Sequence, residues 1–265
     1  MRRQIISLLV VLPAAMAAMS CSVKEDRSAC PCYLTLNFDE LSNAGECGDG
    51  LVTISSDGII SQEQISVQDY FGSGYESVVP RRHVTASCVA GLAEEKWDAD
   101  ILYVPDGIQW GRIMLASEGL DCKEDEYVVP MHFNKEYCTV TVEILGIAEN
   151  NTSLWTVRLS ASSCGIRMDD RFPVSGPYSV IASRQGEGTV YSVRVPRQSD
   201  FDMSLDLSAK DGTSFCLDIG RLVQDQGYDW TRPDLEDIYV VVDYARAVAS
   251  VDIRKWNVND VDESI

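Results

Sequence analysis

Apolar and polar residues alternate along much of the chain with a period of two. The apolar positions of the first such segment, residues 32–38, are Cys32, Leu34, Leu36 and Phe38. Successive side chains of a β-strand point to opposite faces of its sheet. The pattern therefore predicts a strand whose four apolar side chains face a hydrophobic core.

The same pattern returns 106 residues later, in residues 138–144. Its apolar row is Cys138, Val140, Val142 and Ile144. This spacing matches a β-sandwich domain of about 100 residues. We therefore interpret the chain as a duplicated sandwich module, in which each half opens with an equivalent strand.

Helical periodicity is nearly absent after residue 21, and strand-like segments follow in both halves. The further predicted strands are 51–54, 77–79, 83–86, 101–104 and 112–115, then 154–159, 190–195, 203–207, 215–219, 238–242 and 251–253. The unbroken apolar run 238–242 predicts a central strand covered on both faces. Turns are expected at Asp57-Gly58, and at Asp211-Gly212 as a tight hairpin. These features predict an all-β fold with antiparallel sandwiches.

The N-terminal end has a different composition. Arg2 and Arg3 precede an apolar run too short for a comfortable membrane span, which is typical of a secretory signal peptide. No later segment approaches 18 uncharged apolar residues. We divide the chain into a signal peptide (1–20), a tether (21–30), an N-terminal sandwich (31–130) and a C-terminal sandwich with a short acidic tail (131–265).

The signal peptide ends in a small residue followed by Cys21. This ending resembles a bacterial lipobox, although Ala18 stands where leucine is usual. The resemblance implies that Cys21 becomes the first mature residue and carries lipid; ordinary cleavage that leaves a thiol is the alternative. The polar residues 22–28 resemble signals that direct lipoproteins of Bacteroidales to the outer face of the outer membrane, and a plain charged linker is the other interpretation.

Charge excludes one class of partner. The chain has 22 basic and 41 acidic residues, a net charge of -19. Without Arg2 and Arg3 of the signal peptide, 20 basic residues face 41 acidic ones, which gives -21. Nucleic-acid binding depends on Lys and Arg contacts to phosphates, so nucleic acid is a poor partner.

Eight cysteines remain besides Cys21, an even number that permits disulfides in an exported protein. Five of them lie in strand-like patterns and are equally explained as small core residues: Cys32, Cys88, Cys138, Cys164 and Cys216.

No C-x-x-C pair is present, and His83 and His132 have no i, i+4 partner, so we expect no metal site. No G-x-S-x-G elbow or G-x-G-x-x-G loop before a helix is present, and we expect no enzyme activity, catalytic residue or cofactor.

Acidic clusters and tryptophans leave two interpretations each. The acidic clusters include Glu94-Glu95, Asp169-Asp170 and residues 234–237. Solvated loop charge explains them more simply than a glycosidase pair or a calcium site. The tryptophans are Trp97, Trp110, Trp155, Trp230 and Trp256. Core positions explain them more simply than a sugar-binding platform does.

Three stretches resemble the minor fimbrial anchor lipoproteins of the FimB type. They are the run from Cys21 through residues 30–38, residues 132–138 and residues 227–238. The resemblance implies two transthyretin-like sandwiches, a lipid anchor in the outer membrane and a place at the base of a type V pilus. It also implies a fimbrial stalk subunit as partner, engaged by strand exchange or docking.

The first strand of an anchor is expected to stay paired, which leaves its own groove occupied. Docking would then involve the C-terminal region, either residues 249–256 as a strand donor or the tail 257–265. Val258 and Val261 do not share strand parity, which favours a frayed end for the tail. The leading functional hypothesis is a non-enzymatic, lipid-anchored fimbrial subunit exposed on the cell surface. The alternative is a surface glycan-binding lipoprotein of a polysaccharide-utilisation system.

Overall fold

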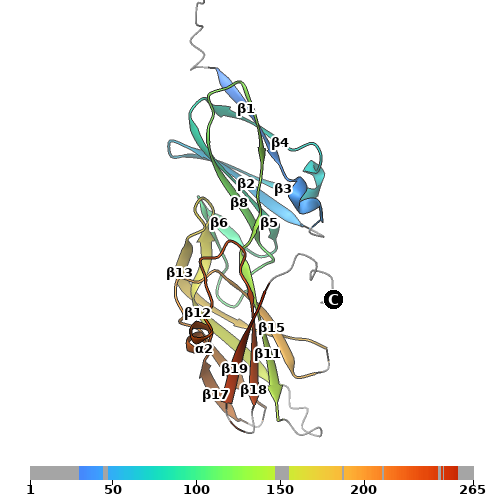
Figure 1. The fold of residues 1–265 in the computed structure, drawn as a ribbon, viewed down its shortest axis with the longest axis vertical. Helices are drawn as coiled ribbons and strands as arrows, with labels where there is room; N and C mark the ends of the chain where they lie inside the picture. Colours follow the sequence, from blue (N-terminus) through green and yellow to red (C-terminus); the bar gives the residue numbers. More distant parts are fainter. Residues whose placement is uncertain are drawn as a thin grey trace, which may run out of the picture. The chain divides into compact units, whose positions relative to one another are not determined.

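Nearly all regular structure in the chain is β-strand (Figure 1). The computed structural model describes residues 30–43, 47–146, 155–186, 188–210, 212–243, 246 and 248–255. Within these residues there are 19 strands, one α-helix and two short 3-10 helices. The all-β prediction is confirmed. None of these helices is long and apolar enough to cross a bilayer.

The first half of the chain supplies two sheets. The smaller has the order β4 (Tyr75–Pro80), β1 (Pro31–Asn37) and β9 (Glu126–Pro130). The larger has the order β10 (Asn134–Lys135), β8 (Met114–Asp121), β5 (His83–Leu92), β2 (Asp49–Ser56) and β3 (Ile59–Ser66). The 3-10 helices η1 (Asp39–Asn43) and η2 (Val67–Tyr70) follow β1 and β3.

Two further sheets belong mainly to the second half. One has the order β14 (Ser183–Arg184), β15 (Val190–Pro196), β11 (Tyr137–Leu145), β18 (Asp237–Asp243) and β19 (Val248–Arg254). The other has the order β17 (Ser214–Asp218), β16 (Ser204–Ser208), β12 (Thr156–Arg167), β7 (Ile101–Tyr103) and β6 (Lys96–Asp98), with β13 (Pro173–Ile181) also paired to β12. The helix α2 (Ile219–Asp225) follows β17 and contacts β19.

The two opening strands occupy equivalent places. β1 lies between an antiparallel neighbour, β4, and a parallel one, β9. β11 likewise lies between antiparallel β15 and parallel β18. The two parallel pairs depart from the expected all-antiparallel sandwiches. In each half, the opening strand thus pairs in parallel with a strand from late in that half, and this shared arrangement supports the interpretation of a duplicated module.

The predicted inward rows are confirmed. All eight apolar residues of the two rows are at most 1% exposed. The row of β1 belongs to one hydrophobic cluster and the row of β11 to a second, larger one. Burial alternates along β18, since Ile238, Val240 and Val242 are buried whereas Tyr239 and Val241 are only half-buried. Its central position was predicted correctly, but cover on both faces was not.

Two pairings cross the expected division at residue 130. β10 follows that residue, yet it pairs antiparallel with β8 of the first half. β6 and β7 precede residue 130 in sequence, yet β7 pairs antiparallel with β12 over Ile101–Tyr103. Pro31–Ile265 forms one compact unit. That residues 31–130 and 131–265 are two separate sandwich domains stays a prediction.

The expected turn at Asp57-Gly58 is present, and of the second pair Asp211 lies outside the described residues. Asp57 and Gly58 have φ of 49° and 77° and connect β2 to β3. Gly212, at φ 90°, lies in the hairpin that joins β16 to β17. Positive φ at consecutive positions is the geometry that Asp-Gly and Asn-Gly hairpins favour.

Several elements were not predicted from the sequence, among them α2, β13 and β3. Helix α2 begins at the last residue of a predicted strand, because Ile219 and Val223 are four residues apart and both are buried. Its N-cap, Asp218, accepts a hydrogen bond from the Arg221 amide at 3.2 Å. β13 contains Gly and Pro and pairs with β12 through irregular register, and β3 has mostly exposed polar residues. Neither strand shows the alternation of a buried row.

The described cysteines form no disulfide. Cys32, Cys88 and Cys138 are fully buried, which confirms them as small core residues. Cys164 is half-buried and Cys216 is exposed. The core assignment is wrong for Cys216 because Phe215 and Leu217 supply the inward positions of β17.

We predict that Gly165→Ala destabilises the chain by about 1–3 kcal/mol, the range typical of overpacking. A Cβ at Gly165 would lie 2.2 Å from the Leu102 carbonyl oxygen, where β12 meets β7. Urea unfolding measures the change. Gly188→Ala is the matched control, because its nearest neighbour lies 4.0 Å away. Equal stability of the two variants would contradict the close approach of these strands.

We predict that a thiol reagent modifies Cys216 in the native protein far faster than Cys32, Cys88 or Cys138. Burial raises the pKa of the Cys138 thiol to about 12, so little thiolate forms at that site. Peptide mass spectrometry after brief labelling would identify the modified residues. Rapid labelling of Cys138 in folded protein would contradict the burial of the β11 row.

Candidate functional site

Two of the stretches that carry the sequence resemblance, residues 132–138 and 227–238, lie against each other. The Lys135 amide donates to Asp234 Oδ1 at 2.9 Å, and the Leu235 amide donates to the Lys135 carbonyl at 3.2 Å. The Lys135 side chain is 1% exposed. Its ammonium donates to the Leu235 carbonyl at 2.9 Å and to Asp237 Oδ1 at 2.7 Å. A buried ammonium of this kind needs such partners to offset its lost hydration.

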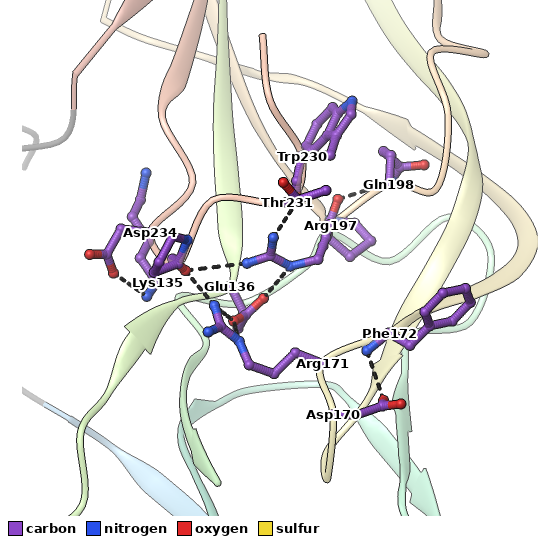
Figure 2. Close-up of polar contacts among 12 residues, drawn as sticks. Lys135, Glu136, Asp170, Arg171, Phe172, Arg197, Gln198, Trp230, Thr231 and Asp234 are labelled. Carbon is purple, nitrogen blue, oxygen red and sulfur yellow. Dashed lines mark hydrogen bonds and ion pairs between the residues drawn. The ribbon is translucent and has the colours of Figure 1, made fainter.

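Glu136 forms the centre of the site. Its carboxylate is fully buried and lies between the guanidinium groups of Arg171 and Arg197 (Figure 2). Arg197 Nε donates to Glu136 Oε2 at 2.8 Å, and Arg171 donates to Oε1. Burial raises the pKa of Glu136, and the two guanidinium groups oppose that shift. Two charge-assisted contacts hold this carboxylate in one orientation.

The same two arginines fix the neighbouring loop. Arg197 donates to the carbonyls of Trp230 and Pro233, and Arg171 also donates to Pro233. Loop carbonyls that would otherwise face water thus bind buried donors. We call Glu136, Arg171, Arg197 and these two carbonyls the Glu136 cluster.

Arg171 reaches Glu136 from a strained turn between β12 and β13. Its φ is 64°, in the left-handed region that few non-glycine residues adopt. The turn is closed by Arg167 N donating to the Phe172 carbonyl at 2.8 Å and by Phe172 N donating to Asp170 at 3.0 Å. Hydrogen bonds from Arg167 lower the pKa of Asp170. Conformations of this kind persist where surrounding contacts over-determine them.

A pocket of 340 Å³ opens beside the cluster. Its wall comes from three segments: residues 170–173, 197–199 and 230–231. Phe172 is 60% exposed, whereas Gln198 is buried and uses its amide to bind Ser163 and the Pro196 carbonyl. The pocket therefore has a rigid polar floor and an exposed aromatic ring.

The chemistry of these groups is that of binding and support. In the described residues, no group of three His, Cys, Asp or Glu side chains is placed to hold a metal ion. His83 and His132 lie near single carboxylates, Asp121 at 3.2 Å and Glu40 at 3.0 Å, far apart in sequence from each other. The charged groups of the Glu136 cluster are engaged with one another.

The site differs from the residues singled out in the sequence. Cys21 and Trp256 lie outside the described residues. Trp110, Trp155 and Trp230 are buried, as expected for core positions, and Trp97 is half-buried. The solvated-loop interpretation is wrong for two members of the acidic clusters. Glu95, 4% exposed, accepts from the amides of Ala93 and Gly111, and Glu236 is 9% exposed.

Sequence reasoning missed Lys135, Glu136, Arg171 and Arg197. No local spacing joins them, because they come from segments up to about 60 residues apart. The one available signal was the pair of family-like stretches, residues 132–138 and 227–238, which meet in the structure. That resemblance identified the segments without assigning roles to their charged side chains.

No protein-family profile matches the chain, and no curated protein matches it in sequence. Solved structures do match. A candidate adhesin from Bacteroides ovatus aligns with TM-score 0.60 and 10% identity, over 86% of this chain and 96% of the other. The chain shares its fold. The fimbrial anchor protein Mfa2 from Porphyromonas gingivalis aligns with TM-score 0.57 and 15% identity, over 86% and 98%.

A third similar structure comes from Bacteroides thetaiotaomicron and is described as a candidate polysaccharide-binding protein. It aligns with TM-score 0.59 and 9% identity, over 89% of this chain and 100% of the other. These matches extend over most of the chain. They agree, at the level of the fold, with the resemblance that the sequence stretches indicate.

We predict that Glu136→Gln lowers the free energy of unfolding by about 3–5 kcal/mol, the cost typical of breaking a buried ion pair. The substitution leaves Arg171 and Arg197 without their counter-charge while keeping the side-chain shape. Chemical unfolding followed by tryptophan fluorescence measures the loss.

The control for that substitution is Asp57→Asn, which removes one partner of the exposed pair Asp57–Arg82. Exposed pairs contribute at most about 1 kcal/mol, so we expect little change. A Glu136→Gln protein as stable as the control would show that the cluster does not support the fold.

Proposed function

We propose that this chain is a lipid-anchored minor fimbrial subunit that attaches a fimbria to the outer membrane at the cell surface. Acyl chains on Cys21 are the membrane attachment in this proposal, and the two halves carry the connection to the fimbria. The shared fold with a fimbrial anchor protein and with candidate adhesins supports the proposal.

The observation that carries the proposal is the pairing of β1. β1 begins ten residues after Cys21 and is paired on both sides, over six positions with β4 and five with β9. Both edges of this strand are therefore occupied by the chain itself. A subunit that receives a neighbour's strand needs an open strand edge. A subunit that ends the fibre at the membrane does not need an open edge beside β1.

The same pairing suits a tether under tension. In this proposal, tension from the tether enters the fold at β1, where backbone hydrogen bonds to both neighbours resist it. The path then continues without a long linker, since only residues 131–133 separate β9 from β10. Met131 N donates to the Asn37 carbonyl at 3.0 Å, which ties this connection back to β1.

At the other end, the Glu136 cluster holds the start of β11 to the loop that precedes β18. β11 and β18 form a parallel pair of the second half. In this proposal, tension therefore passes from the connection at residues 131–136 directly into two central strands. Buried, charge-assisted contacts are suited to this role because water does not compete for them.

The proposal places fimbrial docking near the C-terminal region. Of the two candidate donor segments, residues 249–254 lie in β19, which pairs with β18 over seven positions. Those residues are part of the fold. The tail 257–265 lies outside the described residues, and docking through it, or along β19, stays a prediction.

We predict that Cys21→Ala moves most of the chain from the outer-membrane fraction to the soluble fraction. The variant loses the acyl chains, each buried CH₂ of which contributes about 0.8 kcal/mol. Fractionation with immunoblotting measures the shift, and electron microscopy of the medium tests whether fimbriae detach.

Cys216→Ser is the matched control, because Cys216 is an exposed thiol far from the tether in sequence. Retention of the Cys21 variant in the membrane would contradict lipid anchoring. Release of the protein without release of fimbriae would contradict the fimbrial role.

A further inference from the structure

The proposed membrane attachment and fimbrial docking do not use the pocket beside the Glu136 cluster. Phe172 lies at its rim with 60% of its surface exposed, although a phenylalanine ring is normally buried. The backbone on both sides of this ring is fixed, because the Phe172 amide and carbonyl are both hydrogen-bonded within the turn. The guanidinium of Arg167 lies 5.6 Å from the ring centre. An exposed ring held this firmly presents a prepared apolar surface.

Polar groups surround this ring in the arrangement that a hydroxyl-rich ligand requires. Arg171, part of the pocket wall, uses Nε and Nη2 for Glu136 and Pro233, and its Nη1 has no partner among the described residues. Ser199 and Thr231 add hydroxyl oxygens, whose protons bind Asp200 at 3.4 Å and Asp229 at 2.6 Å, and Asp170 adds carboxylate oxygens that already accept from Arg167 and the Phe172 amide. Each of these oxygens has more than one lone pair and can accept a further hydrogen bond. Figure 2 shows Asp170 and Arg171 coming from one segment and Thr231 from another around the cluster. The wall thus offers both donors and acceptors beside one aromatic face.

We propose that this pocket binds the terminal ring of a neutral saccharide. A volume of 340 Å³ lies at the lower end of small-molecule pockets and suits one sugar ring with its hydration. The C–H face of a pyranose packs on Phe172. Its hydroxyl groups accept from Arg171 Nη1 and donate to the Ser199 and Thr231 oxygens and to the Asp170 carboxylate.

Two other ligand classes fit the same wall less well. An extended peptide needs a row of open backbone groups, but the Arg167–Phe172 pair is already closed and the Pro196 carbonyl is bound by Gln198. A polyanion needs unpaired positive charge. Arg197 uses all three of its nitrogens, Arg171 is paired with Glu136, and Arg167 is paired with Asp170. The charges therefore favour a neutral sugar.

The test is saturation-transfer NMR on the soluble Cys21→Ala chain. The probes are five neutral monosaccharides (glucose, galactose, mannose, fucose and N-acetylglucosamine), with glucuronic acid as the charged comparison. At least one neutral sugar is expected to bind. Phe172→Ala is expected to weaken that binding by about tenfold, the effect of losing one aromatic contact. Because Phe172 is exposed, this variant is expected to unfold at the same urea concentration as the parent chain.

Tyr33→Ala is the matched control, since Tyr33 is an aromatic residue 56% exposed on β1. Its binding is expected to equal that of the parent. Absence of transfer from all neutral sugars, binding of glucuronic acid alone, or equal binding by the Phe172 variant would each overturn the proposal. The outcome is independent of fimbrial attachment, because a chain that fails this test can still anchor a fimbria, and a chain that releases its fimbria can still bind the sugar.

Discussion

A carboxylate removed from water must be matched by positive charge, and Glu136 imposes this constraint on the second half of the molecule. Its partners come from the turn after β12, the end of β15 and, through shared carbonyls, the loop before β18. Each of these segments is fixed because the carboxylate cannot remain buried without it. The Trp110 indole, which donates to the Glu136 carbonyl at 3.0 Å, adds a contact from the first half of the sequence. One buried charge thus sets the positions of three otherwise unrelated segments, two directly and the loop before β18 through shared carbonyls.

Much of the fold was accessible from the sequence because its central strands are buried on one face. The rows that begin at Cys32 and Cys138 alternate without interruption, and both lie in the cores. Alternation reports which face of a strand is buried, but it does not report which strands are neighbours. The parallel pairing of β1 with β9, and the placement of β6 and β7 beside β12, depend on contacts between distant residues and left no local pattern. Exposed strands such as β3 left none either.

The candidate site was much less accessible. Lys135 and Glu136 stand in a short polar stretch that is ordinary for a loop, and both side chains are nevertheless buried. What buries them is the approach of residues 230–237, about a hundred positions later. Phe172 shows the opposite case. In the sequence, a phenylalanine near an acidic pair is equally compatible with a core position and with a turn. Only the structure shows that Phe172 is more exposed than the buried aromatic residues. Charge clusters assembled from distant segments are the class of feature that a single sequence conceals.

The parallel pairing of β1 with β9 has a consequence for the order of folding. If the chain is exported from its N-terminus, as the proposed lipid anchoring requires, β1 is delivered first, while hairpins such as β2–β3 can close from local contacts alone. β1 must wait for β4 and then for β9, the last strand before the second half. During that interval its edges are open to any strand nearby. The sheet that contains β1 is therefore the last part of the first half to close. A chain halted during export would present β1 with an open edge that can accept another strand.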